Sequence, residues 1–177
     1  MSRRIEVLAR AALPAAWYDA VVALCTRAYE EPFAEYLAPL PDGVHALAFD
    51  GDAVVSHAMW VDRTLTSEGR ALHTAYVEAV ATEPAHERRG HATAVLRALA
   101  DAIVASGAYE LAVLSPSDRA FYARLGWEPW RGPLLVATDA GVEPTPDEEV
   151  MILRLPRTPP LDLDAPLVAP WRTGEVW

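Results

Sequence analysis

Two neighbouring stretches decide the fold of this chain: YVEAVAT at residues 76–82 and ERRGHATA at residues 87–94. The first is rich in β-branched and aromatic residues and is followed by Glu83-Pro84, a pattern typical of a strand. From Thr93 the apolar period changes, because Val95, Leu99 and Ile103 fall on one helical face that runs to about Ser106. The sequence therefore predicts a strand, a short basic loop and a helix in succession.

The loop between this strand and this helix has the composition of an anion site. The first N–H groups of a helix have no internal partner and lie at the positive end of its dipole. Arg88 and Arg89 add positive charge, and the small residues after them let a phosphate approach the backbone. An ordinary turn with a solvated basic loop would have the same composition, so both interpretations stay open at this point.

Length and composition predict one globular domain over residues 1–177. The chain is 52% hydrophobic and 23% charged, and no apolar run approaches the roughly 20 residues of a membrane-spanning helix. Cys25 is the only cysteine, and residues 1–4 lack the apolar core of a signal peptide, so we expect a cytoplasmic location. The net charge of −10 argues against a nucleic-acid partner and is compatible with a cationic small substrate, although many proteins are simply acidic.

The rest of the chain predicts an α/β fold. Strands are expected at 3–9, 44–49, 53–61, 109–114, 127–137 and 150–155, a helix at 15–29, and a second helix that begins at Ser115-Pro116 and stops at Gly126. Asp50-Gly51-Asp52 is a hairpin signal. The acidic and aromatic passage 30–36 is either a lid or packing against the core, and we favour the lid slightly. The tail 156–177 holds five prolines and several leucines, which predicts an extended C-terminal arm laid on the body.

Two motifs resemble those of the Gcn5-related N-acetyltransferase (GNAT) superfamily. Arg89-Gly90-His91-Ala92-Thr93-Ala94 falls within its acyl-CoA pyrophosphate pattern, (Gln/Arg)-x-x-Gly-x-(Gly/Ala), with Ala92 in place of the usual first glycine. FYARLGW at 121–127 resembles its Tyr-x-x-x-Gly-(Phe/Trp) element. The resemblance implies a mixed, mostly antiparallel sheet, splayed at its centre and flanked by helices, and acetyl-CoA as cosubstrate with no metal. The cosubstrate-binding residues that it implies are Val80, Ala81, Thr82, Arg88, Arg89, Gly90, His91, Ala92, Thr93, Ala94 and Ser115.

The same resemblance implies two catalytic residues. Tyr122 matches the tyrosine that protonates the departing thiolate, and Glu78 matches a strand carboxylate that deprotonates the amine, sometimes through water. A carboxylate within an apolar strand is costly unless it is paired or functional. The alternatives are a tyrosine packed on a helix face and a structural ion pair between Glu78 and an arginine.

A narrower resemblance, to the aminoglycoside 2′-N-acetyltransferases, covers nearly the whole chain. Its most specific part is the ending WRTGEVW at 171–177, and it implies direct transfer of an acetyl group to a 2′-amine in a ternary complex. The acids that it implies for the drug pocket are Asp147, Glu175 and the carboxylate of Trp177, with Glu78. Pro32 departs from the subfamily, which has an aspartate there, and Glu30, Glu31 and Glu35 are nearby substitutes.

This second resemblance also implies a homodimer and a place in antibiotic resistance. Two rival functions remain: acetylation of another amine, such as a polyamine, an amino acid or a peptide N-terminus, and a module that binds drug or CoA without turnover. The presence of both Tyr122 and Glu78 argues against the module.

Overall fold

The protein is described by a computed structural model that covers residues 4–177 and divides into two compact units. Unit 1 contains the chain up to Val61 and then Val77–Ala102, and unit 2 contains Asp62–Tyr76 and Ile103–Trp177. Strands β3 (Ala53–Ser67) and β4 (Arg70–Thr82) and helix α3 (His91–Ser106) each run from one unit into the other. The expected first residue of the first strand, Arg3, lies outside the described residues.

In unit 1, strands β1, β2 and β3 pair antiparallel in that order. Strand β1 (Arg4–Ala9) pairs with β2 (Val44–Asp50), and β2 pairs with β3 from Val44↔Trp60 to Asp50↔Ala53. Gly51 has a φ of +58° at the turn of the β2–β3 hairpin, a left-handed conformation that glycine adopts without a steric penalty. The hairpin that Asp50-Gly51-Asp52 predicted is therefore confirmed, while β3 extends six residues beyond the predicted end at residue 61.

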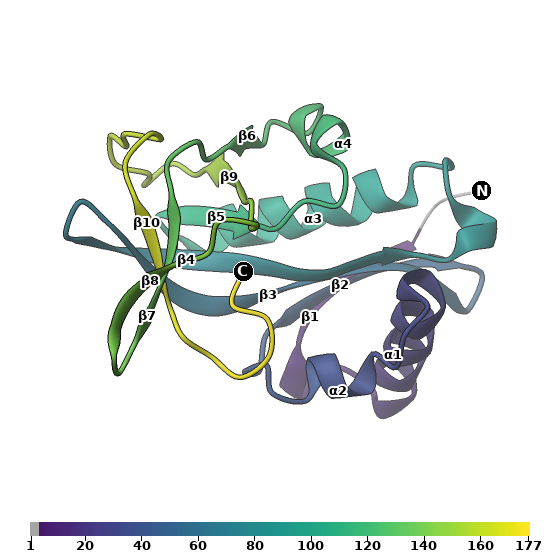
Figure 1. Ribbon diagram of the computed structural model, residues 1–177. Coiled ribbons are helices and arrows are strands. Elements are labelled where there is room, and N and C mark those ends of the chain that lie inside the picture. The colour runs from purple at the N-terminus through teal and green to yellow at the C-terminus, as the bar shows by residue number, and fades with distance from the viewer. Residues whose placement is uncertain (1–3) are drawn as a thin grey trace. The chain divides into compact units, whose positions relative to one another are not determined.

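The helices of unit 1 cover both faces of its strands. Figure 1 shows α1 (Ala15–Tyr29) and α2 (Ala34–Leu37) on one face and α3 on the other. The helix at 15–29 has the bounds that its apolar period predicted, and Val21 and Leu24 on its inner face are fully buried. On α3, Val95 and Leu99 are buried in the same way. Two short 3-10 helices, η1 (Arg10–Ala12) and η2 (Pro84–His86), follow β1 and β4.

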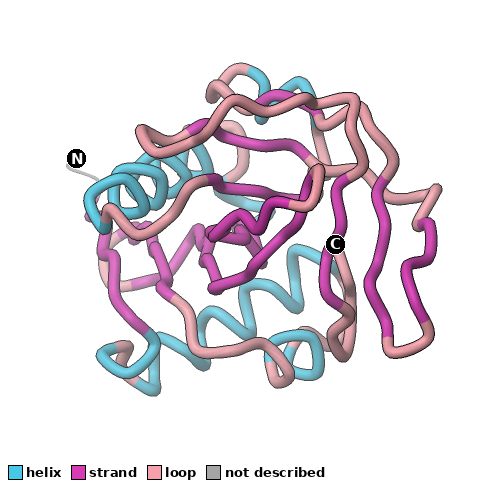
Figure 2. Tube along the Cα trace, turned by 90° about the vertical axis from the view of Figure 1, so that its left-hand side faces the viewer, coloured by secondary structure: helices cyan, strands magenta, loops and turns pink. Residues whose placement is uncertain are grey.

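Unit 2 contains the remaining strands. Its elements are β5 (Leu111–Leu114), α4 (Arg119–Ala123), β6 (Glu128–Pro129), β7 (Leu134–Thr138), β8 (Gly141–Pro144), β9 (Met151–Arg154) and β10 (Leu167–Pro170). Strand β5 pairs in parallel with β4 and antiparallel with β9, and β10 pairs in parallel with β7 and antiparallel with the end of β3. Figure 2 shows β10, β7 and β8 side by side on the right of the view.

The C-terminal arm is fixed within unit 2 by close backbone contacts. The Gly132 N–H donates to the Leu163 carbonyl at 2.8 Å. A Cβ atom at Gly132 would lie 2.0 Å from the Ala165 carbonyl oxygen, so any larger residue would push the arm away. The arm then continues as β10, and the Trp177 side chain at its end is only 3% exposed.

The mixed α/β architecture was predicted, but several elements differ from the prediction. The second helix begins at Arg119, not at Ser115-Pro116, because the Asp118 carboxylate caps it by accepting a hydrogen bond from the Phe121 N–H at 3.1 Å. The predicted strand at 127–137 is divided into β6 and β7 around Gly132-Pro133. Strand β8 was missed because all four of its residues are exposed, so it lacks the alternation that marks a strand. Among the described residues, no helix is long and apolar enough to cross a membrane.

Two histidines and the cysteine are buried in unit 1. His57 is fully buried on β3 and His45 is 1% exposed on β2, and their Nε2 and Nδ1 atoms lie 2.9 Å apart. Burial lowers the pKa of His45 to about 4, with a further decrease from the charge of Arg10. Burial also lowers the pKa of His57 to about 3. Burial raises the pKa of the Cys25 thiol on α1 to about 12.

These two depressed pKa values predict a stability that falls in acid. Above pH 6.5, the ordinary histidine pKa, His45 and His57 are neutral in both the folded and the unfolded protein. Below this pH, the two side chains bind protons in the unfolded protein but stay neutral in the folded protein. The free energy of unfolding should fall with a slope that approaches about 1.4 kcal/mol per pH unit for each histidine. Urea denaturation between pH 7.5 and 4.5 measures that slope. The variant H45N/H57N should show a shallower dependence of the unfolding free energy on pH. Equal slopes for the variant and the wild type would contradict the assignment of this acid sensitivity to His45 and His57.

Candidate functional site

Glu78 lies on β4 within unit 1, and its carboxylate is held by a tyrosine from the early loop. The side chain is 5% exposed, and its Oε2 accepts a hydrogen bond from the Tyr36 hydroxyl at 2.5 Å. Tyr36 comes from α2, the short helix between α1 and β2. A buried carboxylate with a phenol donor has a fixed direction, which is a requirement for a group that accepts a proton at a defined place.

Three aromatic side chains, from the end of α1, the residue before α2 and α2 itself, form a stack that contacts β4 through its two tyrosines. Phe33 is 2% exposed and stacks between Tyr29 and Tyr36, with ring centroids 4.6 and 4.7 Å apart. The Tyr29 hydroxyl donates to the Val80 carbonyl at 2.8 Å. In the passage 30–36, for which we slightly favoured a lid, Phe33 is buried and Tyr36 contacts β4, so its aromatic residues pack against the body instead.

The backbone of β4 bends at the residue after Glu78. Ala79 has a φ of +51°, in the left-handed region that residues with a Cβ atom seldom adopt. The Ala79 carbonyl accepts a hydrogen bond from His57 Nδ1 at 2.8 Å. Further along the strand, the Ser56 hydroxyl donates to the Ala81 carbonyl at 3.0 Å and lies 2.8 Å from the Thr82 hydroxyl.

The basic loop leads directly into the N-terminus of α3. Arg88 and Gly90 have φ values of +59° and +79°, and Arg88, Arg89 and Gly90 are exposed. Helix α3 begins at His91 and has no acidic residue in its first turn. Ala92, Thr93 and Ala94 form that turn together with the buried His91. The first-turn N–H groups, two arginines and the absence of a competing carboxylate fit a pyrophosphate.

Tyr122 belongs to α4 in unit 2. It is 3% exposed and packs edge-on against Phe121 and Trp127, with ring centroids 5.1 and 6.3 Å away. Burial raises the pKa of its hydroxyl to about 12, against a smaller opposing effect of a hydrogen bond with Ser117. The phenol therefore stays protonated throughout the range in which proteins work, as a general acid requires. Ser115 precedes α4 and is exposed.

The end of the chain is anchored within unit 2 by hydrogen bonds at two successive residues. The Trp177 indole N–H donates to the Thr145 hydroxyl at 2.9 Å. Arg63, which is 8% exposed, donates from Nη1 to the Val176 carbonyl at 2.5 Å and from Nη2 to the Pro170 carbonyl at 3.2 Å. These bonds fix the position of the terminal residue.

In unit 2, the charges of two acids act on a third acid, Glu148. Burial raises the pKa of Glu148, and the charges of Glu175 and Asp147 raise it further. Asp147 and Glu175 are exposed. Such a group of carboxylates attracts a cation with several amines.

The acids of the early loop are exposed, in contrast to the buried Glu78. Glu30, Glu31 and Glu35 are all exposed, and Glu30 ends α1 with a φ of +57°.

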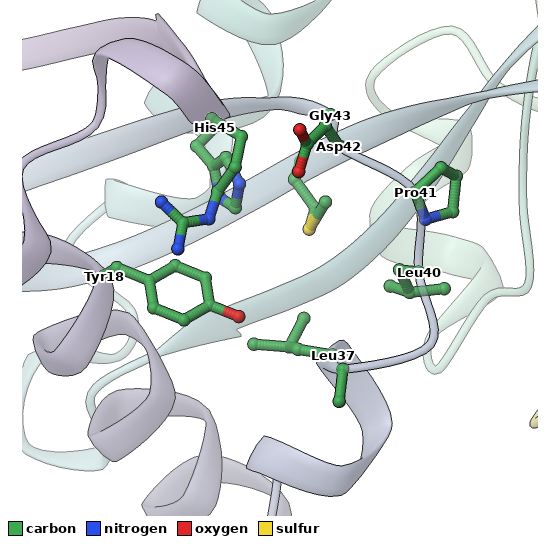
Figure 3. Close-up of a pocket in the computed structure, with 10 residues that line it drawn as sticks. Tyr18, Leu37, Leu40, Pro41, Asp42, Gly43 and His45 are labelled. Atoms are coloured by element: carbon green, nitrogen blue, oxygen red, sulfur yellow. The ribbon is translucent and has the colours of Figure 1, made fainter.

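Next to this loop, unit 1 has a cavity of about 200 Å³ between α1, α2 and the start of β2 (Figure 3). Its lining includes Tyr18, Asp42 and His45, so it brings a phenol and a carboxylate to one space. Among residues 4–177, no three His, Cys, Asp or Glu side chains converge as a metal site.

Tyr36 and Glu148 take part in these arrangements and were missed by sequence reasoning. Tyr36 was quoted only as part of an aromatic loop, because its partner lies 42 residues away. Glu148 stands in a run of acids, Asp147-Glu148-Glu149, from which composition alone does not select one. Arg63 was also missed, since nothing around it indicates that it binds backbone carbonyls near the C-terminus.

Comparison with known proteins identifies the family. The model of an acetyltransferase (GNAT) domain matches residues 13–130. An aminoglycoside 2′-N-acetyltransferase of Mycolicibacterium fortuitum is 40% identical over 141 residues, which is 76% of this chain and 71% of that protein.

Solved structures share the fold at lower identity. The GNAT family N-acetyltransferase YhbS of Escherichia coli, in complex with CoA, superposes with a TM-score of 0.65 at 16% identity and covers 96% of this chain and 91% of its own. Eis1 from Mycobacterium abscessus gives a TM-score of 0.63 at 24% identity over 76% of this chain, which corresponds to about a third (33%) of its own chain. With a family model that spans most of the chain and a relative at 40% identity, this protein belongs to the GNAT acetyltransferase family.

Proposed function

We propose that this protein transfers the acetyl group of acetyl-CoA to the 2′-amine of an aminoglycoside or a closely similar polycationic aminosugar. The observation that carries the substrate class is the 40% identity, over 141 residues, with an aminoglycoside 2′-N-acetyltransferase. The carboxylates of Asp147, Glu148 and Glu175 support it, because the charges of Asp147 and Glu175 raise the pKa of Glu148, and a ligand with several positive charges would stabilise the ionised carboxylates.

In this proposal, Glu78 and Tyr122 move the two protons of the reaction. An ammonium cannot attack a thioester, so Glu78 accepts a proton from the bound amine, directly or through water. The amine nitrogen then forms a bond to the acetyl carbon, the carbon–sulfur bond breaks, and Tyr122 gives its hydroxyl proton to the departing thiolate. The buried position of Glu78 and the raised pKa of Tyr122 suit these two roles.

The cosubstrate would be held by strand β4 and by the basic loop between β4 and α3. We assign the pyrophosphate to the loop from Arg88 to Ala94 and the pantetheine to the backbone of β4 at Val80, Ala81 and Thr82, with Ser115 in addition. The side chains of Glu30, Glu31 and Glu35 remain candidates for the aminosugar, with the carboxylate of Trp177. A homodimer, a cytoplasmic location and a part in antibiotic resistance remain predictions.

Thiol release from acetyl-CoA in the presence of a panel of amines tests the substrate class. The sharpest comparison uses two aminoglycosides that differ only in bearing an amine or a hydroxyl at the 2′ position. We expect turnover with the amine and none above background with the hydroxyl. Faster turnover with a polyamine, an amino acid or a peptide would replace the aminoglycoside assignment. No thiol release with any amine would contradict the enzymatic proposal.

The variant Tyr122→Phe tests the general acid. It removes the hydroxyl and keeps the ring, so packing against Trp127 should be unchanged. We expect kcat to fall by about 10²–10⁴-fold, while acetyl-CoA affinity, measured by calorimetry, stays within about threefold. Phe121→Tyr in the same helix serves as a control for a neighbouring aromatic change. Wild-type turnover of Tyr122→Phe across the pH range would remove this residue from the mechanism.

Glu175→Gln tests the acidic group near the C-terminus. The substitution removes one exposed charge, and we expect KM for the aminoglycoside to rise about tenfold, equivalent to about 1.4 kcal/mol, with KM for acetyl-CoA unchanged. The effect should shrink as salt is added, because exposed charges are screened. Glu143→Gln on β8, an exposed acid of the same unit, is the matched control. An equal rise in KM for both variants would mean that only net charge matters.

A further inference from the structure

The residue that follows Glu78 is strained, and one side chain of the core contacts it. Ala79 has a φ of +51° although it carries a Cβ atom, and such backbone persists only where the surroundings hold it. Its carbonyl accepts a hydrogen bond from Nδ1 of His57, which is fully buried on β3. All of these residues belong to unit 1.

The contacts of His57 define its tautomer. A carbonyl oxygen can only accept, so the proton of His57 lies on Nδ1. Burial lowers the pKa of His57, so the ring is neutral and its Nε2 is an acceptor. His45 Nδ1, 2.9 Å away, must then carry the proton that it donates to His57. The two rings form a directed chain of hydrogen bonds that ends on the Ala79 carbonyl.

The outer ring of this chain is itself held in place. His45 is 1% exposed and lies edge-on to the Tyr18 ring, with centroids 6.2 Å apart. It lines the cavity of Figure 3 beside Tyr18. The orientation of His57 is therefore determined by two strands and by helix α1.

Simple packing does not account for this arrangement. A leucine would fill much of the same space without burying polar ring nitrogens, which is costly unless they are hydrogen-bonded. The hydrogen bond to Ala79 supplies what a leucine cannot, namely a donor directed at a strained carbonyl. The neighbours of Ala79 are held as well, Glu78 by Tyr36 and Val80 by Tyr29.

We propose that His57, oriented by His45, is a positioning residue that holds the left-handed backbone of Ala79 and thereby sets the direction of the Glu78 carboxylate. Relaxation of Ala79 to ordinary strand geometry would turn Glu78 relative to Tyr36 and shift the Val80 backbone. The claim that His57 affects proton transfer rests on the proposed role of Glu78 as base. The claim that His57 holds the backbone of Ala79 is independent of that role.

The test compares two substitutions of His57, one that keeps a hydrogen-bond donor and one that removes it. His57→Asn keeps an N–H donor at the position of Nδ1, and His57→Leu removes it. We expect His57→Leu to lower kcat about 10–100-fold with little change in KM for the aminoglycoside, and His57→Asn to stay within about threefold of wild type. If both variants lose thermal stability and keep wild-type kcat, His57 is structural only and the proposal is wrong.

Crystal structures of the variants give a readout that does not depend on turnover. We expect a negative φ at Ala79 in His57→Leu and a positive φ in His57→Asn. A positive φ retained in His57→Leu would overturn the proposal. If His57→Leu does not fold, His45→Leu and His45→Asn provide the same comparison one ring further away.

The variant Glu78→Gln separates this inference from the proposed function. If His57 acts through Glu78, His57→Leu should lower kcat no further in a Glu78→Gln background. Wild-type kcat in Glu78→Gln alone would remove the base assignment, while the Ala79 φ in His57→Leu would still decide the backbone claim. A full additional loss in the double variant would contradict positioning through Glu78.

Discussion

The left-handed backbone of Ala79 is the constraint on which the arrangement of β4 in unit 1 depends. A β-strand with regular geometry would alternate its side chains without interruption, and one residue with positive φ breaks that alternation. The buried Glu78 precedes the break and Val80 follows it. A tyrosine of α2 donates a hydrogen bond to Glu78 and a tyrosine of α1 donates one to Val80. With the hydrogen bond from His57 to Ala79, three successive residues of β4 are held by three separate side chains. The polar groups of this part of the core are therefore concentrated around the irregular residue of the strand.

In the proposed mechanism, this arrangement links the direction of the Glu78 carboxylate and the acid stability of the protein through the same two rings. The hydrogen bond from His57 to Ala79 needs a proton on Nδ1, and the hydrogen bond that His57 accepts from His45 needs a neutral imidazole whose Nε2 carries no proton. Burial supplies that neutrality by lowering the pKa of both histidines, and it makes protonation of the folded protein costly. A core that positions a carboxylate in this way is therefore expected to lose stability in mild acid.

Elements with a strong local signal could be predicted, and contacts between distant residues could not. The bounds of α1 follow from its apolar period, and the β2–β3 turn follows from Asp-Gly. The start of α4 was wrong because Ser115 and Asp118 are both good caps, and only the structure shows which carboxyl or hydroxyl meets a free N–H. Glu78 stood out as a carboxylate in an apolar strand, whereas Tyr36 and His57 did not. A tyrosine in an aromatic loop and a histidine in a strand acquire their roles only from partners that the fold supplies.

The reactivity of the buried Cys25 thiol can report local unfolding of helix α1 without an added probe. Cys25 is the only cysteine in the chain, and it is fully buried on the inner face of α1, with its pKa raised to about 12. Because the thiolate is the reactive form, Cys25 in the native protein should not react with disulfide reagents. The CoA thiol released in an assay would then be detected without a background from the enzyme. Labelling of this one sulfur then requires α1 to leave the sheet, and its rate under native conditions measures the free energy of that local opening.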